Sequence, residues 1–250
     1  MGQGIVTFFQ FLIGEVDQLS SRNLRTVARR QIRAYIQERQ MAAFAEADIV
    51  RDFYDGATTV AQAHGVGGLE PNTVLMGWSE REEGRSQLLR LLNTLVNLRK
   101  SVLLLHYDDQ RGFGARRVID VWWGGRSRNA ELMLLLAHII ARHASWEGAE
   151  IRLLRVIHNA DGKAQTERHL RELLDDVRVQ ATAIAVVARE GQSFHRTVAE
   201  WSANTDLSLL GMSRPPAAER TAYAQRLNQM IDAVGTVLLV HSASEEKLLA

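Results

Sequence analysis

Short apolar runs alternate with longer amphipathic segments along most of the chain. Runs such as "VLLLH" at 102–106 and "TVLLVH" at 236–241 have no polar position between their first and last residues. A continuous apolar run of this length is typical of a strand that is buried on both faces of a parallel sheet. The pattern predicts nine strands, at 5–12, 43–50, 73–77, 102–106, 118–121, 151–157, 183–188, 207–211 and 236–241.

The segments between most of these runs carry apolar residues at the period of an α-helix. Strands that alternate with helices in this way form parallel βαβ units, and the helices then cover both faces of the sheet. The predicted fold class is therefore α/β. The expected helices lie at 24–41, 52–63, 86–98, 130–143, 165–177, 193–203 and 218–234.

The chain also repeats itself. "NTVLMGWSER", a helix and "SVLLLHYDD" recur as "DLSLLGMSRP", a helix and "TVLLVHSAS". Gly77 precedes His106 by 29 positions, and Gly211 precedes His241 by 30. Self-similarity of this kind indicates a structural unit that occurs twice. We therefore expect two pseudo-repeated parallel βαβ halves.

The expected halves, 1–106 and 118–250, are joined by a polar linker at 107–117 and are unequal. The second half begins with an extra strand and helix, "VIDVWW" through "LMLLLAHII", without a counterpart in the first half. We interpret the chain as a fragment cut within its first repeat. The alternative that stays open is a natural unit whose first copy lost its leading strand and helix.

Composition removes several classes of site. Of the 250 residues, 46% are hydrophobic and 24% charged, which suffices for one sizeable core or two smaller ones. The absence of cysteine excludes disulfides, thiolate metal ligands and thiol nucleophiles. The formal net charge of +1 gives no indication of a nucleic-acid partner, so none is expected. No apolar run approaches the ~20 residues of a membrane-spanning helix.

The glycine cluster in "HGVGGLEPNTVLMGW", at 64–78, poses the question of a phosphate-binding loop. Such a loop needs a strand, then the glycines, then a helix whose N-terminus faces the anion. Here the helix at 52–63 comes first and the strand last, and neither GxGxxG nor GxxxxGK[ST] occurs in the chain. The glycines are therefore interpreted as the end of a helix and a tight connection.

A ligand of this fold class should lie beyond the carboxyl ends of the strands. "GMSRPP" resembles in part the Gly-x-x-Gly loop of nucleotide-binding universal-stress-type domains, with Arg214 in place of the second glycine. The histidines show no metal-ligand spacing, and no nucleophile–base pair is visible. We expect no metal, no catalytic residue and no cofactor, and retain ATP or ADP as an alternative. The nucleotide candidates are Gly77, Trp78, Gly211, Ser213 and Arg214.

Two groups are candidates for contacts with partners. Trp122 and Trp123 end one strand and point to opposite faces, so we expect one core anchor and one interface residue. The second group is an arginine stripe on the helix at 24–41. A solvated face explains the stripe, and the alternative is a basic surface toward anionic lipid or a membrane-embedded partner. The arginine stripe comprises Arg22, Arg25, Arg29 and Arg33.

Several segments resemble the C-terminal domains of cation–chloride cotransporters. "FYDGATTVAQAHGVGGLEPNTVLMGW" is similar to the segment that contains the "GLGxxxPNTVxLG" signature of that family, and "VIDVWW" resembles its "IDVWW" strand. "LMLLLAHIIARHASWEGAEIRLLRV" and the terminal "AVGTVLLVHSASEEKLLA" are similar to the segments that follow in the same order. The resemblance departs at Asn129–Ala130–Glu131, where the family has "DGG", and between Ala188 and Ser208, where the long phosphorylated insert of animal members is missing.

The resemblance implies a universal-stress-protein-like fold in two related halves. It also implies a domain on the cytoplasmic side of the cell membrane that forms homodimers and couples to the transmembrane domain of its parent transporter. The function expected is thus a non-catalytic, cytosolic regulatory and dimerisation domain of a cation–chloride-cotransporter-like secondary transporter. The alternative is a soluble universal-stress-type nucleotide-binding module.

Overall fold

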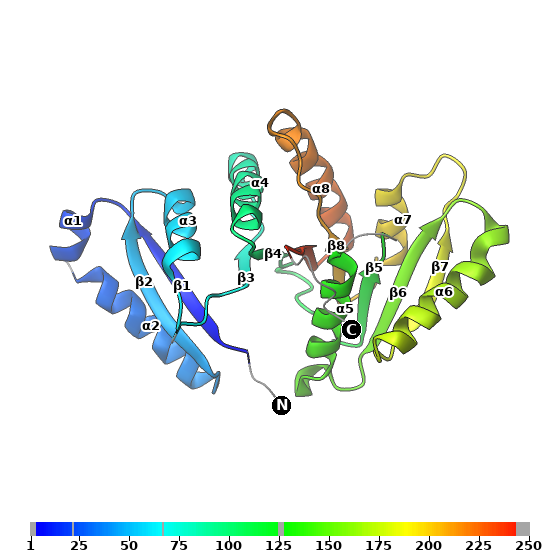
Figure 1. The fold of residues 1–250 in the computed structure, drawn as a ribbon, viewed down its shortest axis with the longest axis horizontal. Helices are drawn as coiled ribbons and strands as arrows, with labels where there is room; N and C mark the ends of the chain where they lie inside the picture. The colour runs from blue at the N-terminus through cyan, green and yellow to red at the C-terminus, as the bar shows by residue number, and fades with distance from the viewer. Residues whose placement is uncertain (1–3, 22, 67, 125–127, 244–250) are drawn as a thin grey trace. The chain divides into compact units, whose positions relative to one another are not determined.

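The computed structural model describes residues 4–21, 23–66, 68–124 and 128–243, which form two compact units. Unit 1 is Met1–Pro71 and unit 2 is Asn72–Ala250 (Figure 1). The boundary between the units falls within the first expected half and not at the linker 107–117. The reason is that the last strand of the first half pairs with the second half, and the strand before it pairs with that last strand, as described below.

Unit 1 is a two-stranded parallel sheet covered by helices. β1 (Val6–Ile13) pairs with β2 (Ala43–Val50), and α2 (Leu24–Glu38) makes the crossover between them, preceded by the short α1 (Val16–Ser21). The next helix, α3 (Phe53–Ala63), is capped at its N-terminus by Asp52, whose carboxylate accepts a hydrogen bond from the Asp55 backbone N–H at 2.9 Å. On the α3 side, the ring of Phe11 packs edge-on against Phe53 at 5.7 Å between centroids.

Unit 2 is built on a seven-stranded sheet with the order β3-β4-β9-β8-β5-β6-β7. Every neighbouring pair is parallel except β4 and β9, which run antiparallel with Leu104 opposite Leu239. The strands are β3 (Thr73–Gly77), β4 (Ser101–His106), β5 (Val118–Trp122), β6 (Glu150–Ile157), β7 (Thr182–Val187), β8 (Leu207–Gly211) and β9 (Val237–His241).

The helices of unit 2 cover both faces of the sheet (Figure 1). Right-handed crossovers from β5 through β7 place α5 and α6 on one face, and the return toward β8 and β9 places α7 and α8 on the other. α4 packs against α8. The bounds are α4 (Glu82–Asn97), α5 (Asn129–Ala141), α6 (Lys163–Asp176), α7 (Phe194–Trp201) and α8 (Arg220–Val234).

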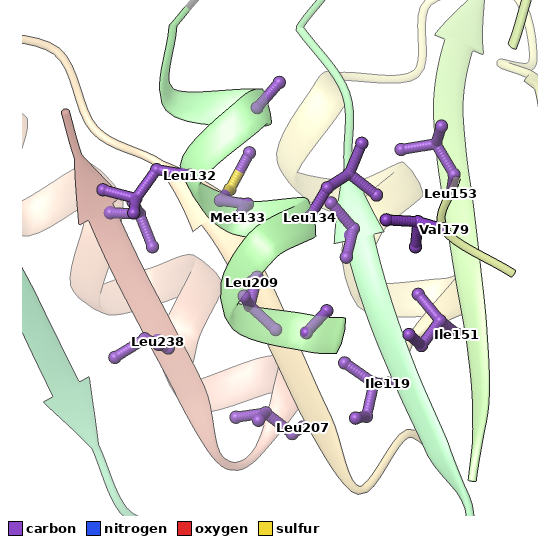
Figure 2. Close-up of a cluster of buried hydrophobic side chains, with 14 of the residues drawn as sticks. Ile119, Leu132, Met133, Leu134, Ile151, Leu153, Val179, Leu207, Leu209 and Leu238 are labelled. Atoms are coloured by element: carbon purple, nitrogen blue, oxygen red, sulfur yellow. The ribbon is translucent and has the colours of Figure 1, made fainter. Parts of the chain in front are cut away.

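The main core of unit 2 lies between α5 and the sheet. α5 is apolar on most of its surface, and Met133 and Leu134 are buried in it. Figure 2 shows these side chains packed against Ile119 of β5 and Leu209 of β8. Because both strands are covered on both faces, their sequences are mostly apolar, with Asp120 in β5 and Ser208 in β8 as the polar positions.

The α/β class is confirmed. The repeat in the sequence is visible as a symmetry of the sheet, because Leu104 and Leu239 are separated by 135 residues, the interval between His106 and His241, and pair with each other. In chain order, β1, β2, β3 and β4 correspond to β6, β7, β8 and β9, and β5 has no counterpart among the described strands.

Candidate functional site at the strand ends

The antiparallel pairing of β4 with β9 divides the strand-end residues into two groups. His106, at the carboxyl end of β4, lies opposite Val237, at the beginning of β9. The carboxyl ends of β3 and β4 therefore lie on one side of the sheet, where the strands β8 and β9 begin, and the carboxyl ends of β8 and β9 lie on the opposite side. The structure consequently does not bring the five nucleotide candidates together. The first group, Gly77 and Trp78, lies at one end of the strands, and the second group, Gly211, Ser213 and Arg214, lies at the other end.

The first group is held against α8. The indole Nε1–H of Trp78 donates to the side-chain oxygen of Asn228 at 3.1 Å, and the Trp78 side chain is buried. Close by on the same helix pair, Gln225 Nε2 donates to Glu82 Oε1 at 2.8 Å. The strand end of β3 is thus bonded to α8, and α8 is bonded to the first residue of α4.

The second group is held against α4. Arg214 Nε donates to Asn93 Oδ1 at 3.1 Å, and its Nη2 donates to Asn97 Oδ1 at 2.7 Å. The backbone N–H of Ser213 donates to the hydroxyl of Tyr223 at 2.9 Å. A guanidinium committed to two amide oxygens is positioned by the protein itself, so a bound anion is not needed to hold it.

The two groups are related by the repeat. Asn228 follows Asn93 by 135 residues, the interval that separates His106 from His241. Each asparagine therefore occupies the same position in its half, and each accepts a hydrogen bond from a strand end of the other half. The polar residues at these strand ends connect the two halves of the sheet.

Two histidines near the second group, His241 and His195, have pKa values below the ordinary value. Burial is the main cause that lowers the pKa of His241 below its ordinary value, opposed by the hydrogen bond from its Nδ1 to the Met212 carbonyl at 2.9 Å. Burial also lowers the pKa of His195, with a smaller effect from Arg226. Neither imidazole has a nucleophile within hydrogen-bond distance in the part of the chain that the structure describes. Those same residues contain no group of three His, Cys, Asp or Glu side chains that could hold a metal ion.

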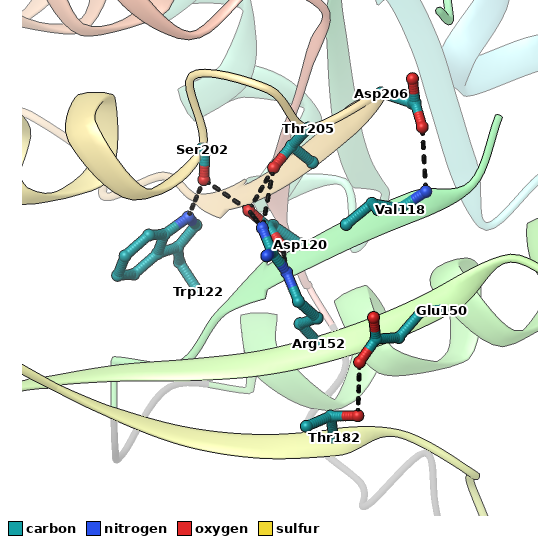
Figure 3. Close-up of polar contacts among 9 residues, drawn as sticks. All are labelled: Val118, Asp120, Trp122, Glu150, Arg152, Thr182, Ser202, Thr205 and Asp206. Carbon is teal, nitrogen blue, oxygen red and sulfur yellow. Dashed lines mark hydrogen bonds and ion pairs between the residues drawn. The ribbon is translucent and has the colours of Figure 1, made fainter. Parts of the chain in front are cut away.

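A buried ion pair that the sequence did not predict lies in the centre of unit 2. Asp120 of β5 is fully buried and binds Arg152 of β6 through two hydrogen bonds, of 2.6 and 2.8 Å (Figure 3). The hydroxyls of Ser202 and Thr205 each donate to Asp120 Oδ2 at 2.6 Å. The hydrogen bond to Asp120 is the largest cause that raises the pKa of Arg152. The available signal was a lone carboxylate in the apolar strand "VIDVWW" and the first of two arginines in the neighbouring "EIRLLRV".

The same network places one of the two tryptophans. Trp122 is buried on the Asp120 side of β5, where its Nε1–H donates to the hydroxyl of Ser202 at 3.0 Å (Figure 3). Its ring also contacts Phe194 edge-on, at 6.1 Å between centroids. Trp123 lies on the other side, half-buried against the α5 core, and its Nε1–H has no partner among the described residues. Trp122 is thus the core anchor, whereas an interface role for Trp123 stays a prediction.

The arginine stripe contacts acidic residues of unit 1. Arg25 forms an ion pair with Asp48 at 2.9 Å, and Arg29 forms one with Glu46 at 3.1 Å, so both connect α2 to β2. Arg33 is exposed and lines a cavity of about 330 Å³ together with Phe44. Arg22 lies outside the described residues.

A second cavity, of about 600 Å³, lies at the carboxyl ends of β6 and β7 and is lined by His158, Arg189, Gln192 and Ser193. It contains none of the nucleotide candidates. Ser193 serves there as the N-cap of α7, accepting a hydrogen bond from the Arg196 N–H at 3.3 Å.

Comparison with known proteins gives the family. The sequence model of solute carrier family 12 matches residues 11–109 and 107–206. The chain belongs to solute carrier family 12. Cation-chloride cotransporter 2 of Oryza sativa subsp. japonica is 27% identical over 236 residues, which cover 90% of this chain and 22% of the rice protein. Potassium/chloride cotransporter 3 of Caenorhabditis elegans is 22% identical over 171 residues, 66% of this chain and 16% of that protein.

Solved structures show the same fold. The cytoplasmic domain of a prokaryotic cation chloride cotransporter superposes with a TM-score of 0.69 at 17% identity, covering 99% of this chain and 88% of that chain. A universal stress protein from Archaeoglobus fulgidus superposes with a TM-score of 0.55 at 12% identity, covering 97% of this chain and 88% of the other. This solute carrier family 12 chain spans only about a fifth of the curated relatives it matches (22% of the rice protein). None of the helices in its described residues has the length and hydrophobicity needed to cross a membrane.

Proposed function

We propose that this chain is the cytosolic regulatory and dimerisation domain of a cation–chloride-cotransporter-like secondary transporter and has no catalytic role. The family match over residues 11–206 carries the proposal. The match occupies about a fifth of relatives that are named as cotransporters, which leaves most of those proteins for the transport machinery. In this proposal the domain lies on the cytoplasmic side of the cell membrane and contacts the transmembrane domain of its own polypeptide.

The absence of a catalytic role is supported by how the strand ends are used. In α/β proteins these positions hold ligands. Here Trp78 and Arg214 are committed to Asn228 and to Asn93 of the opposite half. Side chains that hold the halves of a sheet together are not free to change partners during a reaction cycle.

We assign dimerisation to the surface that includes Trp123, because a partly exposed indole is typical of an interface residue. Sedimentation equilibrium of the chain over a range of concentrations tests this. We expect a reversible dimer that Trp123→Ala weakens. Tyr35→Ala is the matched control, since Tyr35 is also a partly exposed aromatic residue and lies in unit 1. A chain that stays monomeric at every concentration would contradict dimerisation.

Regulation is tested in the parent transporter. The full-length polypeptide is reconstituted in vesicles, and chloride uptake is compared for the wild type, Arg33→Ala and Arg30→Ala. Both arginines are exposed on α2, but Arg33 belongs to the arginine stripe and lines the cavity beside Phe44. We expect Arg33→Ala to change the initial rate of uptake at equal transporter content and Arg30→Ala to leave it unchanged. Equal rates for all three proteins would remove the stripe from the proposal.

The nucleotide-binding alternative makes a different prediction for the isolated chain. Calorimetric titration with ATP and ADP, each at millimolar concentration, would give measurable heat if the strand ends bind a nucleotide, and Arg214→Ala would abolish it. Titrations without heat or thermal stabilisation favour the regulatory domain.

A further inference from the structure

The arginine stripe of α2 runs beside β2 within unit 1. α2 makes the crossover between the parallel strands β1 and β2, so it runs antiparallel to both (Figure 1). Four residues of a helix advance about 6 Å, and two residues of a strand advance about 6.6 Å. Arginines spaced by four on α2 can therefore face every second residue of β2, taken in the opposite order.

Two steps of this match are occupied by ion pairs. Arg25 Nη2 lies 2.9 Å from Asp48 Oδ1, and Arg29 Nη2 lies 3.1 Å from Glu46 Oε1. Asp48 and Glu46 are alternate residues of β2, so their side chains lie on the same face of the strand. As the arginine number rises by four, the number of the acidic partner falls by two.

The stripe lies along the edge of β2 that pairs with no described strand. The carbonyl of Val50 accepts a hydrogen bond from the Gly14 N–H at 2.9 Å, so position 50 faces β1. Because backbone groups of successive residues point to alternate sides, the carbonyl of Ala47 faces away from β1. Arg25 Nε donates to that carbonyl at 2.7 Å. The arginines therefore cover a strand edge and do not simply extend into water.

The third step of the match has no acidic partner. Arg33 follows Arg29 by four residues, and Phe44 precedes Glu46 by two, so the next arginine meets a phenylalanine. Arg33 forms no ion pair or hydrogen bond with any other described residue. Phe44 is 52% exposed. We call the three positions the α2–β2 ladder; they are Arg25–Asp48, Arg29–Glu46 and Arg33–Phe44.

The cavity of about 330 Å³ described above lies at this third position. Pockets for small-molecule ligands span about 300–1,000 Å³, so this one has room for one or two side chains and not for a nucleotide. Its polar lining includes the Arg33 guanidinium and the amide of Gln37, one helical turn further along α2. Glu46 also lines the cavity, but its carboxylate is already paired with Arg29. The charge left for a ligand is that of Arg33.

The rest of the lining is apolar and continues from the core of unit 1 to solvent. Ile36 is buried, Met41 is half-buried and Phe44 is exposed. A single exposed ion pair contributes little to binding. A ligand that is held here must therefore also remove the apolar surface of Phe44 from water.

Charge decides between a lipid surface and a peptide. Recognition of anionic lipid takes clusters of about four to eight Lys or Arg side chains. Of the three described arginines of the stripe, Arg25 and Arg29 are paired with acidic residues of β2, which leaves Arg33. One cation beside an apolar surface matches a carboxylate that has an apolar neighbour, and a peptide supplies both.

We propose that this cavity binds a peptide segment of a partner protein in which an aspartate or glutamate stands beside an apolar residue. The carboxylate takes the acidic place that is missing at position 44, where it pairs with Arg33 and accepts from the Gln37 amide. The apolar side chain lies against Phe44 and Met41. Because the contact is small and has one ion pair, the partner binds transiently. The inference deepens the proposed function and rests on it for the regulatory role of Arg33, since it names what that surface binds.

Selection of random heptapeptides displayed on phage tests the proposal on residues 1–250. On the wild type we expect enrichment of sequences with Asp or Glu beside an apolar residue. Arg33→Glu should select Lys or Arg in place of the acidic residue. Arg30→Glu is the matched control, since Arg30 is also exposed on α2 but does not line the cavity, and it should select the wild-type sequences. No enrichment, or the same acidic sequences on Arg33→Glu, would overturn the proposal.

Fluorescence anisotropy with a labelled form of the most enriched peptide locates the contact. We expect Arg33→Gln to weaken binding about fivefold, the upper value for one exposed ion pair. Replacing the acidic residue of the peptide by its amide should cause a similar loss on the wild type and little further loss on Arg33→Gln. Phe44→Ser should weaken binding at least as much as Arg33→Gln. Independent, additive effects of Arg33 and the peptide carboxylate would overturn the pairing.

Other occupants give different results. Cosedimentation with phosphatidylserine vesicles that Arg33→Gln abolishes would assign the site to lipid, and self-association that Arg33→Gln abolishes would assign it to a second copy. Peptide binding to residues 1–250 but not to the full-length transporter would assign it to a segment of the same polypeptide. Each of these results would make the proposal wrong.

The peptide site and the regulatory proposal fail separately. A selected peptide that needs Arg33, together with chloride uptake that Arg33→Ala leaves unchanged, would reject the regulatory role of the stripe and keep the site. Uptake that changes with Arg33→Ala, without any selected peptide, would reject the site and keep the regulatory role.

Discussion

The ion pair between Asp120 and Arg152 is predicted to be the largest single polar contribution to the stability of unit 2. Asp120 has no exposed surface, and all its polar contacts come from Arg152, Ser202 and Thr205. Asp120→Asn keeps the volume of the side chain but removes the charge that Arg152 requires. The loss of one partner of a buried ion pair costs roughly 3–5 kcal/mol. Because the Arg152 side chain keeps 23% of its surface in water, the lower end, about 3 kcal/mol, is expected.

The opposite replacement should cost more. Arg152→Met fills the space of the aliphatic stem but leaves a buried carboxylate with only two hydroxyl donors, so we expect about 4 kcal/mol. The double variant should cost less than the two single costs combined, with a coupling energy of at least about 1 kcal/mol. The comparison variant is Arg196→Ala, which removes an exposed ion pair with Glu200 and should cost no more than about 0.5 kcal/mol.

Urea unfolding followed by tryptophan fluorescence measures these costs in unit 2 alone. All five tryptophans lie between Trp78 and Trp201, so the signal contains no contribution from unit 1. Trp122 reports on the network directly through its bond to Ser202. An unchanged m-value would show that the midpoint shift is a change in stability. The reasoning is refuted if Asp120→Asn costs no more than Arg196→Ala, or if the single and double variants are additive.

Three other changes have defined outcomes. Asp206→Ala removes the carboxylate that accepts hydrogen bonds from the backbone N–H groups of Ala115, Arg117 and Val118, at 2.7 to 2.9 Å. It should lower the free energy of unfolding in urea by about 1–3 kcal/mol and speed amide exchange at 115–118. Unchanged exchange would contradict the role assigned to Asp206. Gly235→Ala forces a φ of 101° on alanine and brings its Cβ to 3.0 Å from Arg111, so it should lower the melting temperature measurably. Gly162→Ala is the control and should leave the melting temperature unchanged, because Gly162 has a negative φ and open space around its Cα. The pKa of His241 is lower in the folded state than its ordinary value of about 6.5, so the unfolded chain binds the extra proton and stability falls as the pH drops below about 6.5. In urea unfolding His241→Gln should lose less stability than the wild type between about pH 7.5 and pH 5.5, and equal losses would show that His241 is not responsible.

Most elements of the fold could be predicted because burial on both sheet faces leaves an unambiguous sequence. β2, β3 and β8 have the expected bounds; β1 and β7 are shifted by one residue, and the other strands differ by one residue at one end. The six-residue helix α1 was not predicted, since it is too short to show a helical period. Bounds of the longer helices differ by up to four residues, as at the start of α4, where the polar first turn carries no apolar signal.

The grouping of the strand-end residues could not be predicted from the sequence. The cause is the direction of β4 relative to β9. An apolar strand buried on both faces has the same sequence pattern in a parallel and an antiparallel pair, so "VLLLH" and "TVLLVH" do not reveal that β4 and β9 run in opposite directions. This direction places Gly77 and Gly211 at opposite ends of the strands. The pairing of Asp120 with Arg152 was hidden for a related reason, because it depends on a register between two strands that sequence alone does not specify.

The antiparallel join also explains why the strand-end residues hold the sheet together. In each half the helix before the joining strand, α4 before β4 and α8 before β9, lies near the antiparallel join. α4 and α8 therefore pack together, and Asn93 and Asn228 come within reach of the other half. An anion bound to Arg214 would have to replace its hydrogen bonds to Asn93 and Asn97, and would therefore weaken the contact between the halves. Ligand binding at this position and the contact between the loop after β8 and α4 are thus opposed, since the same guanidinium serves both.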